Sequence, residues 1–208
     1  MTVTRILADC SASMPHLERR RFIRRRSVLW YTAIMNICVF CSANDIAEKY
    51  AKPSAEFARL LAAHKHTLIW GGSDRGVMKL IASAAQEEGG KIIGISMKLL
   101  ESHARKNADE MIIAKDLGER KTLMLERADA FVVLPGGIGT LDEITHILEL
   151  KKHALHKKPV VILNTDDFYG GLKKQLQRMA DDGFLTGAVE DYIFFANTPE
   201  EAIEYLEN

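Results

Sequence analysis

A glycine-rich segment at residues 135–143 contains the residues of this sequence best suited to chemistry. It reads Pro-Gly-Gly-Ile-Gly-Thr-Leu-Asp-Glu and follows the apolar run at residues 130–134. The pattern predicts a buried strand, a glycine turn and a helix, and the bare amides at such a helix start bind anionic phosphate. The glycines let the backbone approach a ligand closely. Glu143 adds a carboxylate one turn into the helix, so the segment predicts chemistry on a phosphorylated sugar or nucleotide.

Thr140 and Glu143 also allow a purely structural interpretation. A Thr followed three residues later by a Glu is a capping box, in which the Glu satisfies only the amide of the N-cap residue. Thr140 would then begin the helix as its N-cap, and could still offer its hydroxyl to a phosphate. The local pattern leaves both hypotheses open, because glycine-rich turns of this kind occur in many unrelated proteins.

The elements that must position this segment alternate along the chain. Helices are predicted between the strands, and one of them is expected to open at Pro53 as its first residue. The last helix, at residues 199–206, is predicted to be capped by Thr198. The strands are predicted at residues 36–40, 67–70, 91–96, 110–114, 130–134, 159–163 and 192–195. This alternation predicts an α/β fold: a Rossmann-like, doubly wound parallel sheet with helices on both faces, as a single domain over residues 35–208.

Four loops follow the carboxyl ends of the predicted strands. In open α/β sheets, ligands bind beyond these strand ends, so the loops are expected to converge on one site. The polar segment at residues 97–109 is expected to cross the rim of that site. The four loops are residues 41–44, 71–76, 135–140 and 164–171.

The composition indicates a soluble globular protein with a basic N-terminal extension. The chain has 208 residues, 47% hydrophobic and 27% charged, with a formal net charge of zero. Residues 1–34 contain seven Arg against Asp9 and Glu18, a balance of +5, so the rest carries −5. We expect residues 1–34 to be poorly ordered, with a nucleic-acid arm, a membrane-surface arm or a targeting segment as alternatives. The acidic remainder argues against nucleic acid as a partner, and no apolar stretch is long enough to span a membrane.

The cysteines and histidines predict neither a metal site nor a cofactor. Three cysteines, an odd and low count, indicate a reducing compartment, and we expect a cytoplasmic protein. Cys38 and Cys41 match a C-x-x-C pattern, but they lie along a predicted strand and no second pair exists. We therefore expect both to be buried as small hydrophobic residues. The seven histidines have no acidic partner at ligand spacing.

Three segments together resemble the Lonely Guy family, whose members are cytokinin riboside 5′-monophosphate phosphoribohydrolases. They are the PGGxGTxxE motif at residues 135–143, Glu119-Arg120-Lys121 upstream, and Trp70-Gly71-Gly72 before that. The resemblance covers residues 36–206, and its motif is far more specific than a lone glycine-rich turn. Similar proteins are often labelled lysine decarboxylases, but no residue pattern here argues for a pyridoxal phosphate Schiff base.

The resemblance implies hydrolysis of the N-glycosidic bond of an adenosine 5′-monophosphate, with or without a modified N6 group. The products would be the free purine base and ribose 5-phosphate. Glu143 would stabilise the positive charge that builds on the ribosyl ring or activate the attacking water. Arg120, which matches the family's catalytic Arg, would orient Glu143 and the substrate and keep the carboxylate ionised. No cofactor is implied.

The resemblance also implies how the 5′-phosphate and the rest of the substrate are held. Lys121 would contact the phosphate, and the second glycine turn, Gly71, Gly72 and Ser73, would line the site. The hydroxyl of Thr140 would bond the phosphate, and the amides that would cradle it belong to Gly136, Gly137, Ile138, Gly139 and Thr140.

Four departures from the family pattern leave open which base the substrate carries. They are Leu117 and Gly118 in place of Met-His, Ser73 for a third glycine, Lys79 for a glycine, and Glu149 for a threonine. A prenylated adenine and plain adenine both remain candidates. The alternative functions are a general nucleoside 5′-monophosphate nucleosidase and a non-catalytic module that binds a nucleotide or the molybdenum cofactor.

The resemblance further implies a homodimer with the active site near the interface. The sequence adds that the helix after the motif is apolar over more than one stripe, through Ile144, Ile147, Leu148 and Leu150. One stripe can cover the sheet while another meets a partner helix. The alternative is that this helix is simply buried deeply in its own domain.

Overall fold

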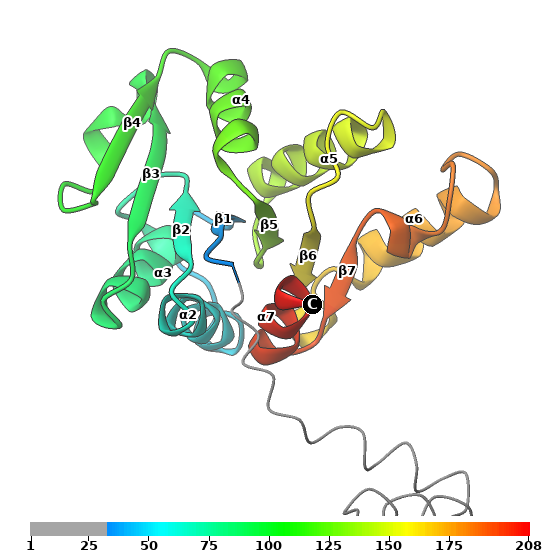
Figure 1. Ribbon diagram of the computed structural model, residues 1–208, viewed down its shortest axis with the longest axis horizontal. Helices are drawn as coiled ribbons and strands as arrows, with labels where there is room; N and C mark the ends of the chain where they lie inside the picture. The colour runs from blue at the N-terminus through cyan, green and yellow to red at the C-terminus, as the bar shows by residue number, and fades with distance from the viewer. Residues whose placement is uncertain (1–32) are drawn as a thin grey trace, which may run out of the picture. The chain divides into compact units, whose positions relative to one another are not determined.

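Seven strands form one parallel sheet in the order β4-β3-β2-β1-β5-β6-β7 (Figure 1). The structure, a computed structural model, describes residues 33–208, and the predicted extension at 1–34 lies outside them except for its last two residues. Each neighbouring pair of strands runs parallel, so the predicted doubly wound sheet is confirmed. The strands are β1 Asn36–Phe40, β2 Thr67–Trp70, β3 Ile92–Met97, β4 Glu110–Ala114, β5 Ala130–Val133, β6 Val160–Leu163 and β7 Phe194–Ala196.

Helices cover both faces of the sheet. Apolar residues of α2, α3 and α7 pack in one cluster with one face, and those of α4, α5 and α6 pack in a second cluster with the other (Figure 1). The helices are α2 Glu48–Ala63, α3 Gly76–Glu87, α4 Leu117–Arg127, α5 Ile138–Lys152, α6 Gly170–Asp181 and α7 Pro199–Glu207, with 3₁₀ turns η2 Lys98–His103, η3 Thr165–Asp167 and η4 Val189–Asp191.

Strand β1 shows why the strand sequences are continuously apolar. Ile37 and Val39 enter the cluster on one face, whereas Cys38 and Phe40 enter the cluster on the other. Successive strand side chains point to opposite faces, so a strand covered on both sides needs apolar residues throughout. Cys38 and Cys41 are both free and buried, in opposite clusters, which confirms their prediction as small hydrophobic core residues.

The expectation that Pro53 opens a helix is wrong. Helix α2 begins at Glu48, and Pro53 lies inside it as the sixth residue. Proline at this position removes one backbone hydrogen bond from the helix, but its fixed φ already has the helical value. The burial of Phe57, Ala58 and Leu61 against the sheet stabilises the helix enough to tolerate that loss.

The chain changes direction across the sheet between β1 and β5. Strands β2, β3 and β4 follow on one side of β1, and β5, β6 and β7 extend on the other. The loops after β1 and β5 therefore diverge, and a crevice opens between them at the carboxyl ends of the strands. Among residues 33–208, no helix is long and apolar enough to cross a membrane.

Candidate active site

A cavity of about 460 Å³ lies at the crevice between the ends of β1 and β5. Its volume falls within the range of small-molecule sites. Its walls come from the loops after β1, β2 and β5, from the 3₁₀ turn η2, and from helices α3, α4 and α5. The lining residues are Cys41, Ser42, Ala43, Asn44, Gly71, Ser73, Arg75, Met78, Leu100, His103, Arg120, Gly137, Ile138, Gly139, Thr140 and Glu143.

The N-terminus of α5 is the anion-binding feature of this cavity. Gly137 is the N-cap residue, no side chain caps the helix, and its first turn lines the cavity. Helix α3 also begins here, but its amides are already used: Val77 N–H donates to the Asn44 carbonyl at 3.3 Å and Met78 N–H to the Ser42 carbonyl at 3.2 Å. Of these two helix ends, α5 therefore offers the unsatisfied amides that a phosphate needs.

The capping-box interpretation of Thr140 and Glu143 is wrong. The helix begins at Ile138, so Thr140 is its third residue and Glu143 its sixth, too far along to bond the N-cap amide. Thr140 is buried against the turn, and a Cβ on Gly136 would lie 2.1 Å from its Oγ1. Gly136 thus lacks a side chain because Thr140 occupies that space.

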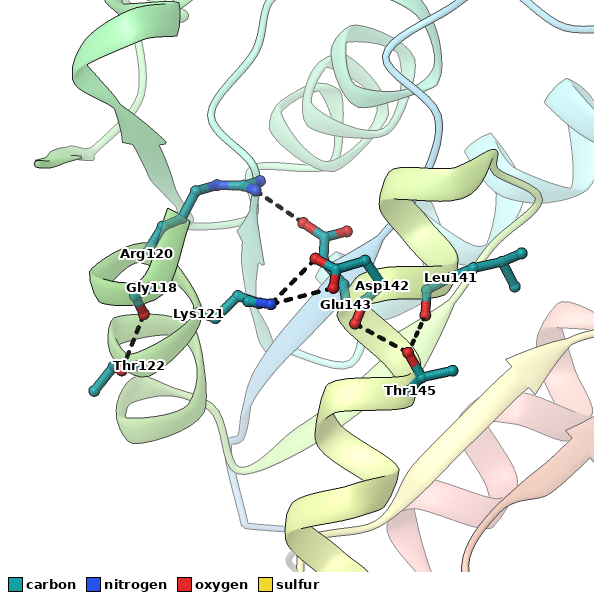
Figure 2. A network of polar contacts seen from close by, with 8 residues as sticks. All are labelled: Gly118, Arg120, Lys121, Thr122, Leu141, Asp142, Glu143 and Thr145. Atoms are coloured by element: carbon teal, nitrogen blue, oxygen red, sulfur yellow. Dashed lines mark hydrogen bonds and ion pairs between the residues drawn. The ribbon is translucent and has the colours of Figure 1, made fainter. Parts of the chain in front are cut away.

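Glu143 is held by Arg120 in a buried ion pair (Figure 2). The Arg120 Nη1 donates to the Glu143 Oε1 at 2.9 Å, and its Nε donates to the carbonyl of Ile95 at 2.9 Å. Both side chains are less than a tenth exposed. Helix α4, which carries Arg120, is capped by Asp116, whose Oδ1 accepts from the Glu119 amide at 2.9 Å. The guanidinium is therefore fixed from two sides.

The first glycine of the second turn makes room for this pair. A Cβ on Gly71 would lie 2.5 Å from the Nη2 of Arg120. Gly72 adopts a φ of +75°, and it packs against Ser96 and Met111 without lining the cavity. The glycines of this turn thus serve close packing, as Gly136 does in the other turn, and Gly71 and Ser73 also form part of the cavity wall.

Burial raises the pKa of Glu143 above its usual value. The charge and hydrogen bond of Arg120 oppose this rise, as expected, but burial outweighs them. Asp142 raises the pKa further and Lys121 lowers it. A carboxylate with a raised pKa is a stronger base, which suits it to take a proton from water.

A second ion pair joins α4 to α5 beside the first (Figure 2). The Lys121 Nζ lies 3.2 and 3.1 Å from the two carboxylate oxygens of Asp142. Lys121 does not line the cavity, and its ammonium points to Asp142. The second pair thus braces the two helices beside the first.

Three of the four loops expected to converge on the site do so. The exception is the loop at residues 164–171, none of whose residues line the cavity. It lies after β6, one strand beyond β5, and so one position away from the crevice. The polar segment after β3 reaches the rim as expected, through Leu100 and His103.

Several lining residues were not singled out from the sequence. Ser42, Asn44 and Arg75 lie in loops that were expected at the site, and His103 lies in the polar segment expected at its rim. Met78 lies in the first turn of α3, and no motif marks any of these side chains. Their position after a strand end was the only available signal. Among residues 33–208, no three His, Cys, Asp or Glu side chains are grouped so as to hold a metal ion.

Comparisons with known proteins identify the family to which the chain belongs. Residues 78–206 match the family model described as "possible lysine decarboxylase". The cytokinin riboside 5′-monophosphate phosphoribohydrolase of Rhodococcoides fascians is 33% identical over 172 residues, which are 81% of this chain and 87% of that protein. The enzyme of that name from Arabidopsis thaliana is 32% identical over 174 residues, 82% of this chain and 76% of the relative.

Solved structures show the same fold. The molybdenum cofactor binding protein of Rippkaea orientalis superposes with a TM-score of 0.66 at 22% identity, covering 84% of this chain and 96% of that one. At this identity the likeness concerns the fold alone. Taken with the two relatives, the fold and the site define a Rossmann-like protein of the phosphoribohydrolase class. The chain belongs to the Lonely Guy family, and the resemblance inferred from its motifs is confirmed.

The neighbours of Glu143 should tune its pKa in opposite directions. We expect Asp142→Asn to lower that pKa, because a negative charge is removed, and Lys121→Met to raise it, because a positive charge is lost. Both shifts should be small, because Asp142 and Lys121 are partly exposed and solvent screens their charges. Titration of carbon-13-labelled glutamate carboxyls by NMR measures both shifts. If the pKa of Glu143 moved in the same direction in both variants, this electrostatic description would be contradicted.

Proposed function

We propose that this protein hydrolyses the N-glycosidic bond of an N6-modified adenosine 5′-monophosphate and releases the free base and ribose 5-phosphate. The observation that carries the proposal is the buried Arg120–Glu143 pair on the floor of a cavity whose wall is the uncapped start of α5. A pure binding module needs the anion site but has no use for a buried carboxylate with a raised pKa. The relatives named above carry this activity in their names.

The spacing along α5 suits a ribose 5-phosphate. The 5′-phosphate binds the amides at residues 137–140, with the Thr140 hydroxyl as a further donor. Glu143 lies five residues beyond Ile138, about 7 Å along the helix at the usual rise per residue. This separation is of the same order as that between the phosphorus and the anomeric carbon of ribose 5-phosphate. Glu143 then faces the bond that breaks.

In the reaction, the bond between the anomeric carbon and the base nitrogen breaks, and the base leaves with the electron pair. The ribosyl ring becomes positively charged, and the Glu143 carboxylate stabilises that charge at close range in a site partly shielded from water. Water adds to the anomeric carbon and gives its proton to Glu143, whose raised pKa favours the transfer. The departing base nitrogen takes up one proton from solvent water and Glu143 releases its proton to solvent, so the products are the neutral base and ribose 5-phosphate. Arg120 holds the carboxylate in line through its bonds to Glu143 and Ile95.

Lys121 and the second glycine turn complete the proposed substrate site. The Lys121 ammonium is paired with Asp142, so its contribution to phosphate binding is a positive charge near the site rather than direct contact. Gly71 and Ser73 border the substrate, and Gly72 shapes their turn. At the wall formed by the first two strand loops and η2, Asn44, Arg75, Met78, Leu100 and His103 surround the base.

The experiment that tests the proposal is release of purine base from AMP and from isopentenyladenosine monophosphate, measured side by side. We expect Glu143→Gln to reduce turnover at least ~100-fold while nucleotide affinity is largely kept, because the substitution removes the charge but little volume. Liquid chromatography of the released base measures the rate, and calorimetry measures the affinity.

A matched control lies on the neighbouring helix, α4. Glu126→Gln removes an exposed carboxylate outside the cavity, and it should leave turnover unchanged. Near wild-type turnover in Glu143→Gln would disprove the proposed role of Glu143. Equal rates with both nucleotides would instead identify a general nucleoside 5′-monophosphate nucleosidase.

We also propose that the protein is a homodimer whose interface includes the surface between α5 and α6. Ile144, Ile147 and Leu148 pack against the protein's own sheet, so this part of the apolar pattern is explained without a partner. A groove with largely apolar walls remains beside them, and Phe184, 72% exposed, lies at the end of α6. The groove is lined by Thr145, Leu148, Glu149, Lys152, Leu172, Gln175, Leu176, Met179, Leu185, Val189 and Tyr192.

The dimer can be tested with two threonines that share the same local structure. Thr145 and Thr122 are both exposed helix residues whose hydroxyls donate to a carbonyl four residues earlier (Figure 2). Thr145→Glu places a charge in the groove and should lower both association and activity, whereas Thr122→Glu on α4 should change neither. Light scattering should give twice 23.3 kDa for the wild type. Full activity in a clean monomer would contradict a role of the interface in the site.

The compartment we propose is the cytoplasm. Cys38 and Cys41 are free thiols in the core, on opposite faces of the sheet. Thiols kept reduced are usual in a reducing compartment.

A further inference from the structure

The loop after β6 is strained although it does not line the cavity. Asp166 and Asp167 adopt φ angles of +53° and +52°. These lie in the left-handed region, which residues other than glycine adopt less readily. Asn164 stabilises this conformation: its Nδ2 donates to Asp167 Oδ1 at 2.9 Å, and its Oδ1 accepts from the backbone amide of Tyr169 at 2.7 Å. A strained conformation of this kind persists where the surrounding structure holds it in place. Here the loop conformation fixes the position of Tyr169.

Tyr169 reaches underneath the phosphate-binding turn. Its side chain is buried, and its hydroxyl donates to the carbonyl of Leu134 at 2.9 Å. Burial raises the pKa of the hydroxyl, which therefore stays protonated, while a contact with the Gly136 backbone acts in the opposite direction. The phenol thus holds the start of the Leu134-Pro135-Gly136 segment through a hydrogen bond, and Gly136 at its end lies near enough to affect the pKa of the hydroxyl.

The turn needs such support because the sheet ends just before it. The last residue of β5 paired with β6 is Val133, opposite Ile162. The Leu134 amide bonds to Phe40, but the Leu134 carbonyl points beyond the paired part of β6 and bonds to the hydroxyl of Tyr169 instead. A buried carbonyl without a partner costs free energy, so loss of this hydroxyl would favour movement of the turn.

We propose that Tyr169 is a positioning residue that sets the direction of the first-turn amides of α5 and thereby the affinity for the 5′-phosphate. The inference rests on the proposed function for the identity of the anion. The loop at residues 164–171 thereby has a role at the site: it supports the phosphate-binding turn without lining the cavity. Tyr169 does not line the cavity, so it acts through the turn and not on the substrate directly.

The test compares Tyr169→Phe with Tyr192→Phe. Tyr192 is also buried, its hydroxyl pairs with Thr186 at 2.6 Å, and it packs in the same apolar cluster but away from the cavity. Both variants lose one hydroxyl hydrogen bond, so both should lose some thermal stability. Tyr192 also lines the groove between α5 and α6, so the control counts only if light scattering shows the wild-type oligomeric state. We expect only Tyr169→Phe to weaken ribose 5-phosphate binding, by about tenfold, while adenosine, which lacks the phosphate, changes less than about twofold.

Calorimetry on the full chain gives the two affinities, with the oligomeric state checked by light scattering. In the hydrolysis assay, KM for the nucleotide should rise with the loss of phosphate affinity, while kcat changes less. Equal affinities of wild type and Tyr169→Phe for ribose 5-phosphate would overturn the inference, as would an equal loss in Tyr192→Phe. A wild type that binds ribose 5-phosphate but releases no base would refute the proposed function, and a selective loss in Tyr169→Phe would still support the positioning role.

Discussion

The buried ion pair between Arg120 and Glu143 is the constraint on which the site depends. Taking two charges out of water is expensive, and their attraction offsets this only when the geometry is good and the remaining donors are satisfied. Here the Ile95 carbonyl accepts from the guanidinium, and Gly71 leaves space for it. Such a pair is poor evidence for stability. Its position at the cavity supports the catalytic role proposed for it.

Many features of the fold follow from the need to place these two side chains together. Arg120 comes from the helix before β5 and Glu143 from the helix after it, and both helices pack on the same face of the sheet. Two adjacent helices on one face present their side chains to each other, and the Lys121–Asp142 pair braces them further out. The switch in strand order between β1 and β5 opens the crevice above the pair.

The sequence predicted the sheet well because its five inner strands are buried on both faces. Continuous apolar runs marked β1, β2 and β4 to the residue, and Thr198 before Pro199 marked the last helix, whose N-cap bond to Glu201 is present. The prediction from Pro53 placed the start of α2 wrongly, because the packing of a whole helix outweighs one missing hydrogen bond.

The site was less predictable because side-chain partners depend on tertiary distance. Nothing local shows that Arg120 is buried, since a charged residue on a short helix is usually solvated, and only the family resemblance pointed to it. The capping-box pattern at Thr140 was misleading because the helix begins two residues earlier, at Ile138. The burial of Tyr169 under the turn depends on a strained loop that no sequence motif marks.

The most direct test of the central claim is a double-mutant cycle on the pair. The rate of base release is measured for Arg120→Met, Glu143→Gln and the double variant, as kcat/KM. If Arg120 acts by holding Glu143, each single variant loses most of the activity, and the double variant is within about threefold of the slower single variant. Losses that multiply in the double variant would show that the two residues act independently and would contradict the account.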